Sequence, residues 1–391
     1  MRRTVIVGSA RTPFGKFGGS LREKSAAELG KIAIREAVER SHVNADDIDL
    51  AIIGQVITAG CGQIPGRQAT IGAGLSEQVP VDQLNKVCAS SLRAVTLADS
   101  IIRSGDADIV VTGGMESMSN APYSIGNMRW GKRMFDSKAD DLMVKDGLWC
   151  PHYDVHMAVH GGKIALANGI SRQMQDEWAV ESQRRAVKAV ENGYLIREMV
   201  PVETKNGIVD KDESPRKGVS LEDIEKLQPL FDAENTVTAG NAPGVNDGAS
   251  ANVLMEEAEA KKRGLESDAI ILGYAMHSED PANIATAPGN AIKKLLSKVG
   301  MASSDIDLYE INEAFAAVTL LSARIAGVDL AKVNVNGGAI AFGHPLGASG
   351  GRIIMTLVSE LQRRNLKYGI AAICSGMGQG DAILIENAKF R

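Results

Sequence analysis

Two cysteines and one histidine are the residues of this chain best suited to covalent chemistry. Cys88 lies in "NKVCASSL", just before an expected helix, whose N-terminal partial charge would lower the pKa of its thiol. His344 lies in "NVNGGAIAFGHPLGASGGR", where six glycines leave few side chains to crowd it. Near a helix N-terminus its ring stays neutral and can take a proton from a thiol. The structural alternatives are a buried cysteine and a histidine held inside a tight turn.

Cys374 and Asn312 each follow a strand-like run. Cys374 stands between "GIAAI" and "SGMGQG", where glycines would expose its side chain and backbone N–H groups suited to binding an oxyanion. Asn312, in "EINEAFA", could orient a water or an imidazole. The alternatives are a core cysteine and a helix N-cap. A nucleophile, a base, a second proton carrier and an orienting amide together suit acyl transfer through a thioester.

Strand and helix patterns alternate along the chain that must position these residues. "TVIVGSA" reads as a buried strand, and the helix that follows begins with Ser25 and Glu28 in capping-box spacing. "DIDLAIIGQV" and "ADIVVTGG" are further strands on either side of a helical segment. This alternation predicts an α/β protein with a largely parallel, covered sheet.

The same strand–helix–strand arrangement occurs twice along the chain. "DDIDLAIIGQV" precedes Cys88 and "SDIDLYEINEAF" precedes His344, with 41 residues from Asp47 to Cys88 and 39 from Asp305 to His344. Each segment leads to a helix and then to a strand that ends in small residues, with Cys374 at the end of the second such strand. We therefore predict an internal duplication that places Cys88 and His344 at matching points; the alternative is the general βαβ rhythm.

The segment between the repeats has a different character. Residues 119–246 mix charge with methionine and tryptophan and carry their own helical patterns. So long an insertion favours a binding or assembly region over a linker. We expect a first half at 1–118, completed by about 247–268, an inserted loop domain at 119–246, and a second half at 269–391.

Composition excludes several classes of function. The 391 residues carry a net charge of −5 and contain no basic tract, so no nucleic-acid partner is expected. We read no membrane-length apolar run and no signal peptide, which predicts a cytoplasmic protein without a membrane partner. Four irregularly spaced cysteines favour free thiols over a zinc site or a disulfide framework.

Five motifs together resemble the thiolase family over nearly the whole chain. They are "NKVCASSLRAV", "GGMESMSNAPY", "NEAFA", "NGGAIAFGHPLGASGGR" and "CSGMGQG", in the family's order and spacing. The resemblance implies the thiolase fold: duplicated βαβαβαββ halves that form a five-layered αβαβα core with an inserted loop domain. Within that family the chain is most similar to the biosynthetic enzymes that interconvert acetyl-CoA and acetoacetyl-CoA.

The resemblance also implies roles for the reactive residues. Cys88 would be acylated, with His344 as its base, and Cys374 would move the proton at the α-carbon of the second substrate. Asn312 would hold a water that, with His344, stabilises the enolate oxygen. The backbone N–H groups of Cys88 and Gly376 would form a second oxyanion hole.

Substrates and assembly follow from the same resemblance. Acyl-CoA and CoA would be substrates and partners, with no tightly bound cofactor and no metal. The expected CoA-binding residues lie in the loop domain, in "TAGNAPG" and in "NEAFA": His156, Met157, Arg216, Ala239, Gly240, Ala242, Pro243 and Phe315. Residues 131–149 resemble the extension that joins two dimers into a homotetramer.

Three departures from the family's usual residues leave the preferred acyl chain of the substrate undecided. Pro243 replaces a usual serine, Ser91 a usual glycine and Ile284 a frequent methionine. A degradative 3-ketoacyl-CoA thiolase acting on longer or branched chains is therefore an alternative. Ketosynthases of the same superfamily lack the second cysteine, and a non-catalytic lipid-binding protein would have no use for three proton-active groups. We also expect Gly343→Val to depress turnover far more than stability, because the glycines would leave room for substrates.

Overall fold

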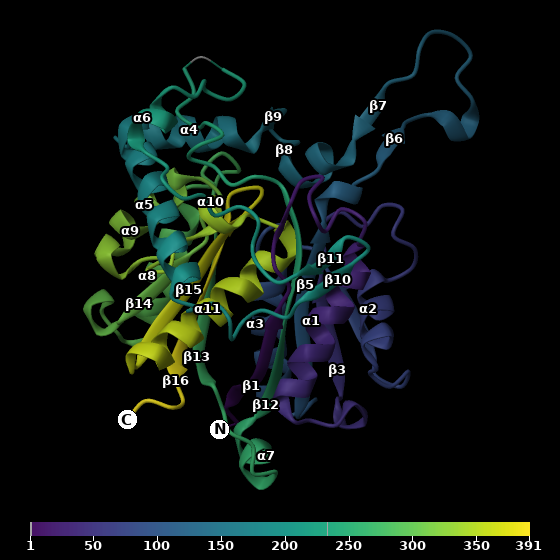
Figure 1. The fold of residues 1–391 in the computed structure, drawn as a ribbon, viewed down its shortest axis with the longest axis vertical. Helices are drawn as coiled ribbons and strands as arrows, with labels where there is room; N and C mark the ends of the chain where they lie inside the picture. The colour runs from purple at the N-terminus through teal and green to yellow at the C-terminus, as the bar shows by residue number, and fades with distance from the viewer. Residues whose placement is uncertain (1, 233) are drawn as a thin grey trace.

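The sheet of this computed structural model, which describes residues 2–232 and 234–391, contains two halves with the same strand order (Figure 1). In the first half the order is β1-β12-β5-β3-β4. β1 and β12 are antiparallel, β12 and β5 are antiparallel, and β5, β3 and β4 run parallel. The strands are β1 (Thr4–Arg11), β2 (Gly15–Lys16, paired with β12), β3 (Leu50–Gly54), β4 (Val81–Leu84), β5 (Ile109–Ser117) and β12 (Asn246–Glu256).

The second half repeats this pattern as β13-β16-β15-β14. β13 and β16 are antiparallel, β16 and β15 are antiparallel, and β15 and β14 are parallel. A single parallel bridge from Tyr309 to Val333 takes the place of β4. The strands are β13 (Ala269–Ser278), β14 (Leu308–Ile311), β15 (Tyr368–Ser375) and β16 (Gln379–Asn387). The shared order confirms the predicted duplication, and β1 and β13 join the halves over Thr4–Ile6.

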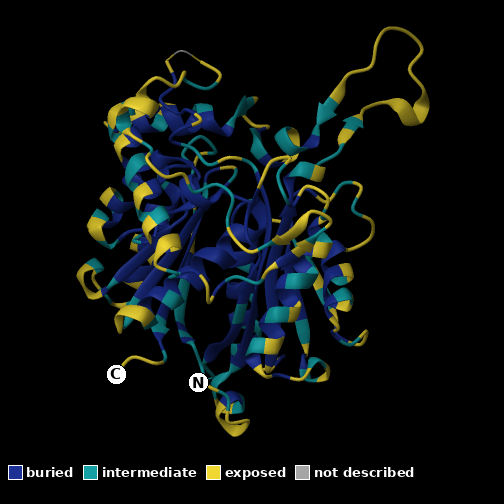
Figure 2. Ribbon diagram, viewed as in Figure 1, coloured by how far each residue is buried: buried dark blue, intermediate teal, exposed yellow. Residues whose placement is uncertain are grey.

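Helices complete five layers. α1 (Ala26–Ser41) and α2 (Pro65–Ala73) pack on the outer face of the first half, and α8 (Ala287–Val299) and α9 (Ala316–Ala326) on that of the second. α3 (Ser90–Ser104) and α11 (Ser349–Arg364) lie between the halves, in one apolar cluster with side chains from both. Figure 2 shows this interior as continuously buried. The five-layered αβαβα prediction is confirmed.

The capping box predicted at the start of α1 is present in the structure. The Ser25 side chain accepts a hydrogen bond from the Glu28 N–H at 3.2 Å, and the Glu28 carboxylate accepts from the Ser25 N–H at 2.8 Å. This reciprocal capping box satisfies two N–H groups that the helix itself leaves unpaired. Between the helix and the sheet, Leu29, Ala33 and Ile34 are buried.

Much of the chain between β5 and β12 lies above the two halves in Figure 1, whereas α5, β10 and β11 lie lower, beside them. Part of it, including Trp178 and Val237, packs into the core of the second half, while Val202 packs into that of the first. Its elements are β6 (Tyr123–Ile125), β7 (Ala139–Asp141), β8 (Trp149–Cys150), β9 (Val155–His156), α4 (Met157–Ala167), α5 (Arg172–Glu191), β10 (Val202–Thr204), β11 (Gly207–Val209) and α6 (Leu221–Glu225). One short helix, α7 (Glu257–Lys262), follows β12.

A β6–β7 arm projects from the body (Figure 1), and its side chains are mostly exposed (Figure 2). Trp130 and Phe135 are each 90% exposed. No helix in the described residues is both long and apolar enough to cross a bilayer.

Candidate active site

Cys88 lies on a strained turn between β4 and α3. Val87, immediately before it, has φ +47°, a left-handed conformation that is rare for a β-branched residue. Two side chains hold the turn: Asn85 Oδ1 accepts from the Val87 N–H at 2.9 Å, and Ser90 Oγ donates to the Val87 carbonyl at 2.7 Å. Strain of this kind persists only where surrounding contacts impose it, and it is common at functional sites.

The Cys88 thiol is protonated at rest. Burial raises its pKa to about 12, and the nearby charge of Glu116 adds to the increase. The prediction that a helix terminus would lower this pKa is therefore wrong. α3 begins two residues later, at Ser90, and removal of the sulfur from water dominates. A nucleophilic Cys88 consequently needs a base beside it.

His344 has the tautomer that such a base requires. Ser349 Oγ donates its only hydrogen to the Pro345 carbonyl at 2.8 Å, so it accepts from His344 Nδ1 at 2.6 Å. Nδ1 therefore carries the proton, and Nε2 keeps its lone pair. Nε2 is buried and has no hydrogen-bond partner among residues 2–232 and 234–391.

The predicted neutral imidazole is confirmed, although the cause differs. Burial lowers the pKa of His344 to about 3, and the nearby Arg352 charge lowers it further. Helix α11 begins only at Ser349, five residues on, with a short helical turn at Leu346–Ala348 between them. Burial, not a helix terminus, is the larger cause of the shift.

The glycines around His344 allow close packing. Gly343 has φ +102°, and a side chain there would overlap Asn246, whose Oδ1 accepts from the His344 N–H at 2.9 Å. A Cβ on Gly347 would come within 2.6 Å of the Met115 carbonyl on β5. The expectation that these glycines leave room for substrates is not supported at Gly343. Gly343→Val would strain the backbone and collide with Asn246, so stability should fall along with turnover.

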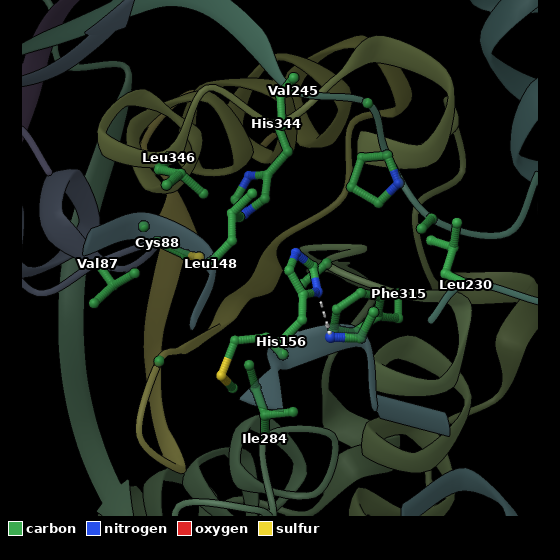
Figure 3. A pocket seen from close by; sticks show the side chains of 18 of the residues that line it. Val87, Cys88, Leu148, His156, Leu230, Val245, Ile284, Phe315, His344 and Leu346 are labelled. Carbon is green, nitrogen blue, oxygen red and sulfur yellow. Dashed lines mark hydrogen bonds between the residues drawn. The ribbon is translucent and has the colours of Figure 1, made fainter. Parts of the chain in front are cut away.

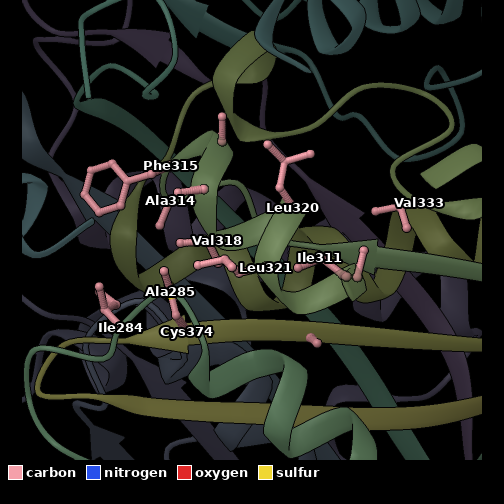
Figure 4. Close-up of a cluster of buried hydrophobic side chains, with 14 of the residues drawn as sticks. Ile284, Ala285, Ile311, Ala314, Phe315, Val318, Leu320, Leu321, Val333 and Cys374 are labelled. Atoms are coloured by element: carbon pink, nitrogen blue, oxygen red, sulfur yellow. The ribbon is translucent and has the colours of Figure 1, made fainter. Parts of the chain in front are cut away.

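Cys374 and Asn312 lie at the carboxyl ends of adjacent parallel strands. Cys374, in β15, is fully buried beside apolar side chains that include Ile284 and Val318 (Figure 4). Burial and the neighbouring Cys88 charge raise the pKa of Cys374 well above its usual range. Both polar atoms of the Asn312 amide, which follows β14, are buried without a partner in the described chain. That amide can hold a water or a substrate oxygen.

One apolar cavity of about 230 Å³ is lined by many of the predicted residues, although Cys374 and Asn312 are not among them (Figure 3). Cys88 and His344 lie at one end, Phe315 and Leu230 at the other, and Ile284 on the wall between them. The predicted residues that line it are Cys88, His156, Met157, Ala242, Pro243, Phe315, His344 and Gly376. Within the described residues, the N–H groups of Cys88 and Gly376 make no hydrogen bond to another residue and so can bind a carbonyl oxygen.

His156 has a defined place in this cavity. Its Nδ1 accepts from the Ala158 N–H at 3.1 Å and caps α4, and its ring stacks on Phe231 at 4.3 Å. Burial lowers the pKa of His156 to about 4. The ring is therefore neutral, with its remaining N–H on Nε2.

Three predicted CoA-binding residues do not line the cavity. Arg216 is exposed over a separate surface hollow beside α5, and its backbone N–H donates to Gln183 at 2.9 Å. Ala239 is exposed. Gly240 is buried where a side chain would press on Ile224 at 2.7 Å, which explains the glycine by packing. A role for these residues in binding CoA stays a prediction.

Several positioning residues were not predicted. Ser349 sets the His344 tautomer, Asn246 holds the His344 backbone, and Glu116 joins three segments. Glu313, next to Asn312, accepts hydrogen bonds from Trp178, Ser182, Asn334 and the Ile340 N–H at 2.8–3.0 Å. The available signal was a charged residue at the end of an apolar strand, in "IVVTGGMES" and in "LYEINEAF".

Comparisons with known proteins agree over the whole chain. The family model for the thiolase N-terminal domain matches residues 4–258, and that for the thiolase C-terminal domain matches residues 265–387. An acetyl-CoA acetyltransferase of Cupriavidus necator is 48% identical over 391 residues, 99% of this chain and 100% of that protein. One of Yarrowia lipolytica is 47% identical over 393 residues, covering 100% of this chain and 98% of that protein. A probable acetyl-CoA acetyltransferase of Escherichia coli is 45% identical over 390 residues, 99% of each chain.

Proposed function

The chain belongs to the thiolase family, and we propose from this premise that it is an acetyl-CoA C-acetyltransferase, which interconverts two acetyl-CoA with acetoacetyl-CoA and free CoA. Full-length identity of 45–48% to acetyl-CoA acetyltransferases carries the proposal. The cavity supports it, because Cys88 and His344 meet there between apolar walls. The enzyme is an acyltransferase whose substrates are CoA thioesters, and no tightly bound cofactor or metal is proposed.

Cleavage begins when His344 Nε2 takes the Cys88 proton. The Cys88 sulfur attacks the 3-keto carbon of acetoacetyl-CoA, and the C–C bond then breaks to give acetyl-Cys88 and the enolate of acetyl-CoA. Cys374 donates its proton to the enolate carbon, and the first acetyl-CoA leaves. The free lone pair on Nε2 can accept the Cys88 proton, which the raised pKa of Cys88 would otherwise retain. The raised pKa of Cys374 keeps that thiol protonated until the enolate carbon forms.

Thiolysis of the acyl-enzyme restores every proton. The Cys374 thiolate recovers a proton from protonated His344, and the neutral His344 then takes the proton of incoming CoA, whose sulfur attacks the acetyl-Cys88 carbonyl. The Cys88 sulfur leaves and regains its proton from His344, releasing the second acetyl-CoA. Claisen condensation is the reverse sequence. The N–H groups of Cys88 and Gly376 serve one oxyanion, and His344 with an Asn312-held water serves the enolate oxygen.

Pantetheine would enter past Pro243, Ala242 and Phe231, which line the cavity opposite Cys88. Proline has neither an N–H nor a hydroxyl to offer this arm. Arg216, Ala239 and Gly240 would then contact the nucleotide end of CoA outside the cavity. Residues 119–246 would act as the substrate-binding and assembly unit between the halves at 1–118, completed by 247–268, and 269–391.

A 3-ketoacyl-CoA thiolase acting on longer or branched chains is the second candidate. The observation that favours it is Ile284, 3% exposed, which lines the cavity where a frequent methionine is replaced. Isoleucine is branched at Cβ and has a shape different from that of the flexible methionine. The catalytic residues would be the same, so only the acyl chain distinguishes the two activities.

CoA-dependent cleavage of acetoacetyl-CoA beside 3-ketohexanoyl-CoA and 3-ketodecanoyl-CoA tests the function. We expect a strong preference for acetoacetyl-CoA and, in Cys88→Ala, a loss of kcat of about 10⁴-fold or more, because the nucleophile is gone. Equal or better cleavage of longer chains would select the second candidate. No cleavage of any substrate, with Cys88→Ala indistinguishable from the parent, would refute both.

We also propose a cytoplasmic homotetramer assembled through the β6–β7 arm. A cluster of exposed apolar side chains on a projecting segment is a feature of interaction surfaces. Trp130 and Phe135 are 90% exposed, and Met134 is 70% exposed. Burial of these side chains against a second copy would remove a large apolar area from water.

Replacing Trp130 and Phe135 together by serine should reduce the assembly to half its mass, with the fold retained. Light scattering coupled to size-exclusion chromatography measures the change. Ile208→Ser is the matched control, since Ile208 is 68% exposed but lies on β11, outside the arm. An unchanged mass in the double variant would refute assembly through the arm.

A further inference from the structure

The Glu116 carboxylate joins three segments of the chain beside the cavity. It lies near the carboxyl end of β5 and is fully buried. Its two oxygens accept hydrogen bonds from the N–H groups of Val56 at 3.0 Å, Ile57 at 3.1 Å and Gly347 at 2.9 Å. Val56 and Ile57 follow β3 of the first half, whereas Gly347 belongs to the turn after His344 in the second half.

Gly347 stands inside the turn that orients His344. Pro345 supplies the carbonyl that fixes the Ser349 hydroxyl, and that hydroxyl fixes His344 Nδ1. Pro345 and Ser349 each lie two positions from Gly347. The turn rests directly on β5, because side chains on Gly114 and Gly347 would overlap the opposite backbone. A shift of Gly347 would therefore move the imidazole.

Two other buried carboxylates of this protein are each paired with an arginine. Glu198 is paired with Arg11 at 3.0 Å, and Glu310 with Arg352 at 3.2 Å. Within the described residues, Glu116 is satisfied by backbone N–H groups alone. Such a carboxylate contributes little to stability relative to a paired one, because desolvation opposes its charge. Its three bonds instead connect the two halves beside His344, the proposed base.

We propose that ionised Glu116 is a positioning residue, which holds the turn after His344 so that Nε2 faces the Cys88 thiol. The carboxylate accepts all three N–H groups, whereas its protonated form is a poorer acceptor. The titratable groups that act on it are Asp247 and Cys88, with His344 at the other end of the turn. The proposal rests on the proposed function only for its turnover readout.

The ionisation state gives the proposal a pH signature. Burial raises the pKa of Glu116 to about 7, with backbone hydrogen bonds opposing and the Asp247 charge reinforcing the shift. Its folded-state pKa lies above the ordinary value of 4.5, so ionisation destabilises the fold as pH rises from about 4.5 to 7. Turnover should nevertheless rise as pH passes through about 7.

Charge and positioning predict opposite results for Glu116→Gln, which makes the test decisive. The Glu116 charge raises the pKa of Cys88, so its loss alone would make the thiol more reactive. Loss of positioning would make it less reactive, since His344 would no longer take the proton. The readout is alkylation of Cys88 by iodoacetamide, followed by peptide mass spectrometry. This needs no acyl-CoA, so it remains informative if the proposed function fails.

In Glu116→Gln we expect slower alkylation of Cys88 and a kcat lower by about tenfold. The rise of turnover near pH 7 should disappear, and Tm should be unchanged or higher. In Glu116→Met, where the side chain has no oxygen to accept the three N–H groups, kcat should fall by about 10²-fold, the cost of a small misplacement of His344. Glu360→Gln is the control, a buried carboxylate on α11 bonded to Asn336, Arg363 and Arg364. Faster or unchanged alkylation, or a kcat loss no larger than that of the control, would overturn the proposal.

Discussion

Cys374→Ala is expected to separate the two halves of the reaction. Cys88 should still accept an acetyl group from acetyl-CoA, because His344 alone can pass the proton between Cys88 and the departing CoA. Cleavage of acetoacetyl-CoA should fall by about 10³-fold or more, because no group remains to protonate the enolate carbon. Acylation is measured as the gain of one acetyl group in the intact protein mass, and cleavage by the loss of acetoacetyl-CoA.

The structure explains why this variant should fold. Cys374 is fully buried among apolar side chains, and alanine leaves only the small cavity of one sulfur atom. Cys61→Ala controls for the general effect of removing a thiol, since Cys61 is half-buried and is not part of the cavity wall. Loss of acylation and cleavage together in Cys374→Ala would contradict separate roles for the two cysteines.

His344→Ala is expected to impair both half-reactions by about 10²- to 10⁴-fold, the usual contribution of a general base. Burial holds the Cys88 pKa near 12, so without a base almost no thiolate forms at neutral pH. Alkylation of Cys88 by iodoacetamide should slow in parallel with turnover. Raising the pH should partly restore alkylation in the variant, because hydroxide can then remove the proton.

His160→Ala supplies the matched control for this prediction. His160 is also buried, at 6% exposed, and burial lowers its pKa, but it lies outside the cavity wall. Its turnover should stay within a few-fold of the parent. If His344→Ala retained rapid alkylation of Cys88, another group would have to take the thiol proton, and the assignment of Nε2 as the base would be wrong.

The cavity shows which parts of the site local sequence predicts well. Cys88 and His344 come from two distant motifs, and both line the cavity, as does Gly376, which only the family resemblance implied. Cys88 and His344 could be predicted together because each stands where a strand or turn meets a helix. Such junctions gather at one edge of an α/β sheet. Arg216 and Ala239, predicted by resemblance alone, lie outside the cavity, where only the bound nucleotide would decide their role.

The electrostatics of the site were less predictable. The local sequence indicated a lowered Cys88 pKa, yet burial raises it, because first-half and second-half segments together exclude water from the sulfur. The glycines at 343 and 347 suggested open space, yet they permit contact with Asn246 and β5. For the two glycines the deciding neighbours, Asn246 and Met115, are more than 90 positions away along the chain.

The sequence by itself determined the strand–helix alternation, the internal duplication, the five motifs and the residues able to do chemistry, because periodicity, capping and turn signals act over a few residues. Tertiary structure alone decided the His344 tautomer, the pKa of each thiol and the linkage of three segments by Glu116. These depend on desolvation and on hydrogen bonds between the two halves, which exist only once the halves have packed together.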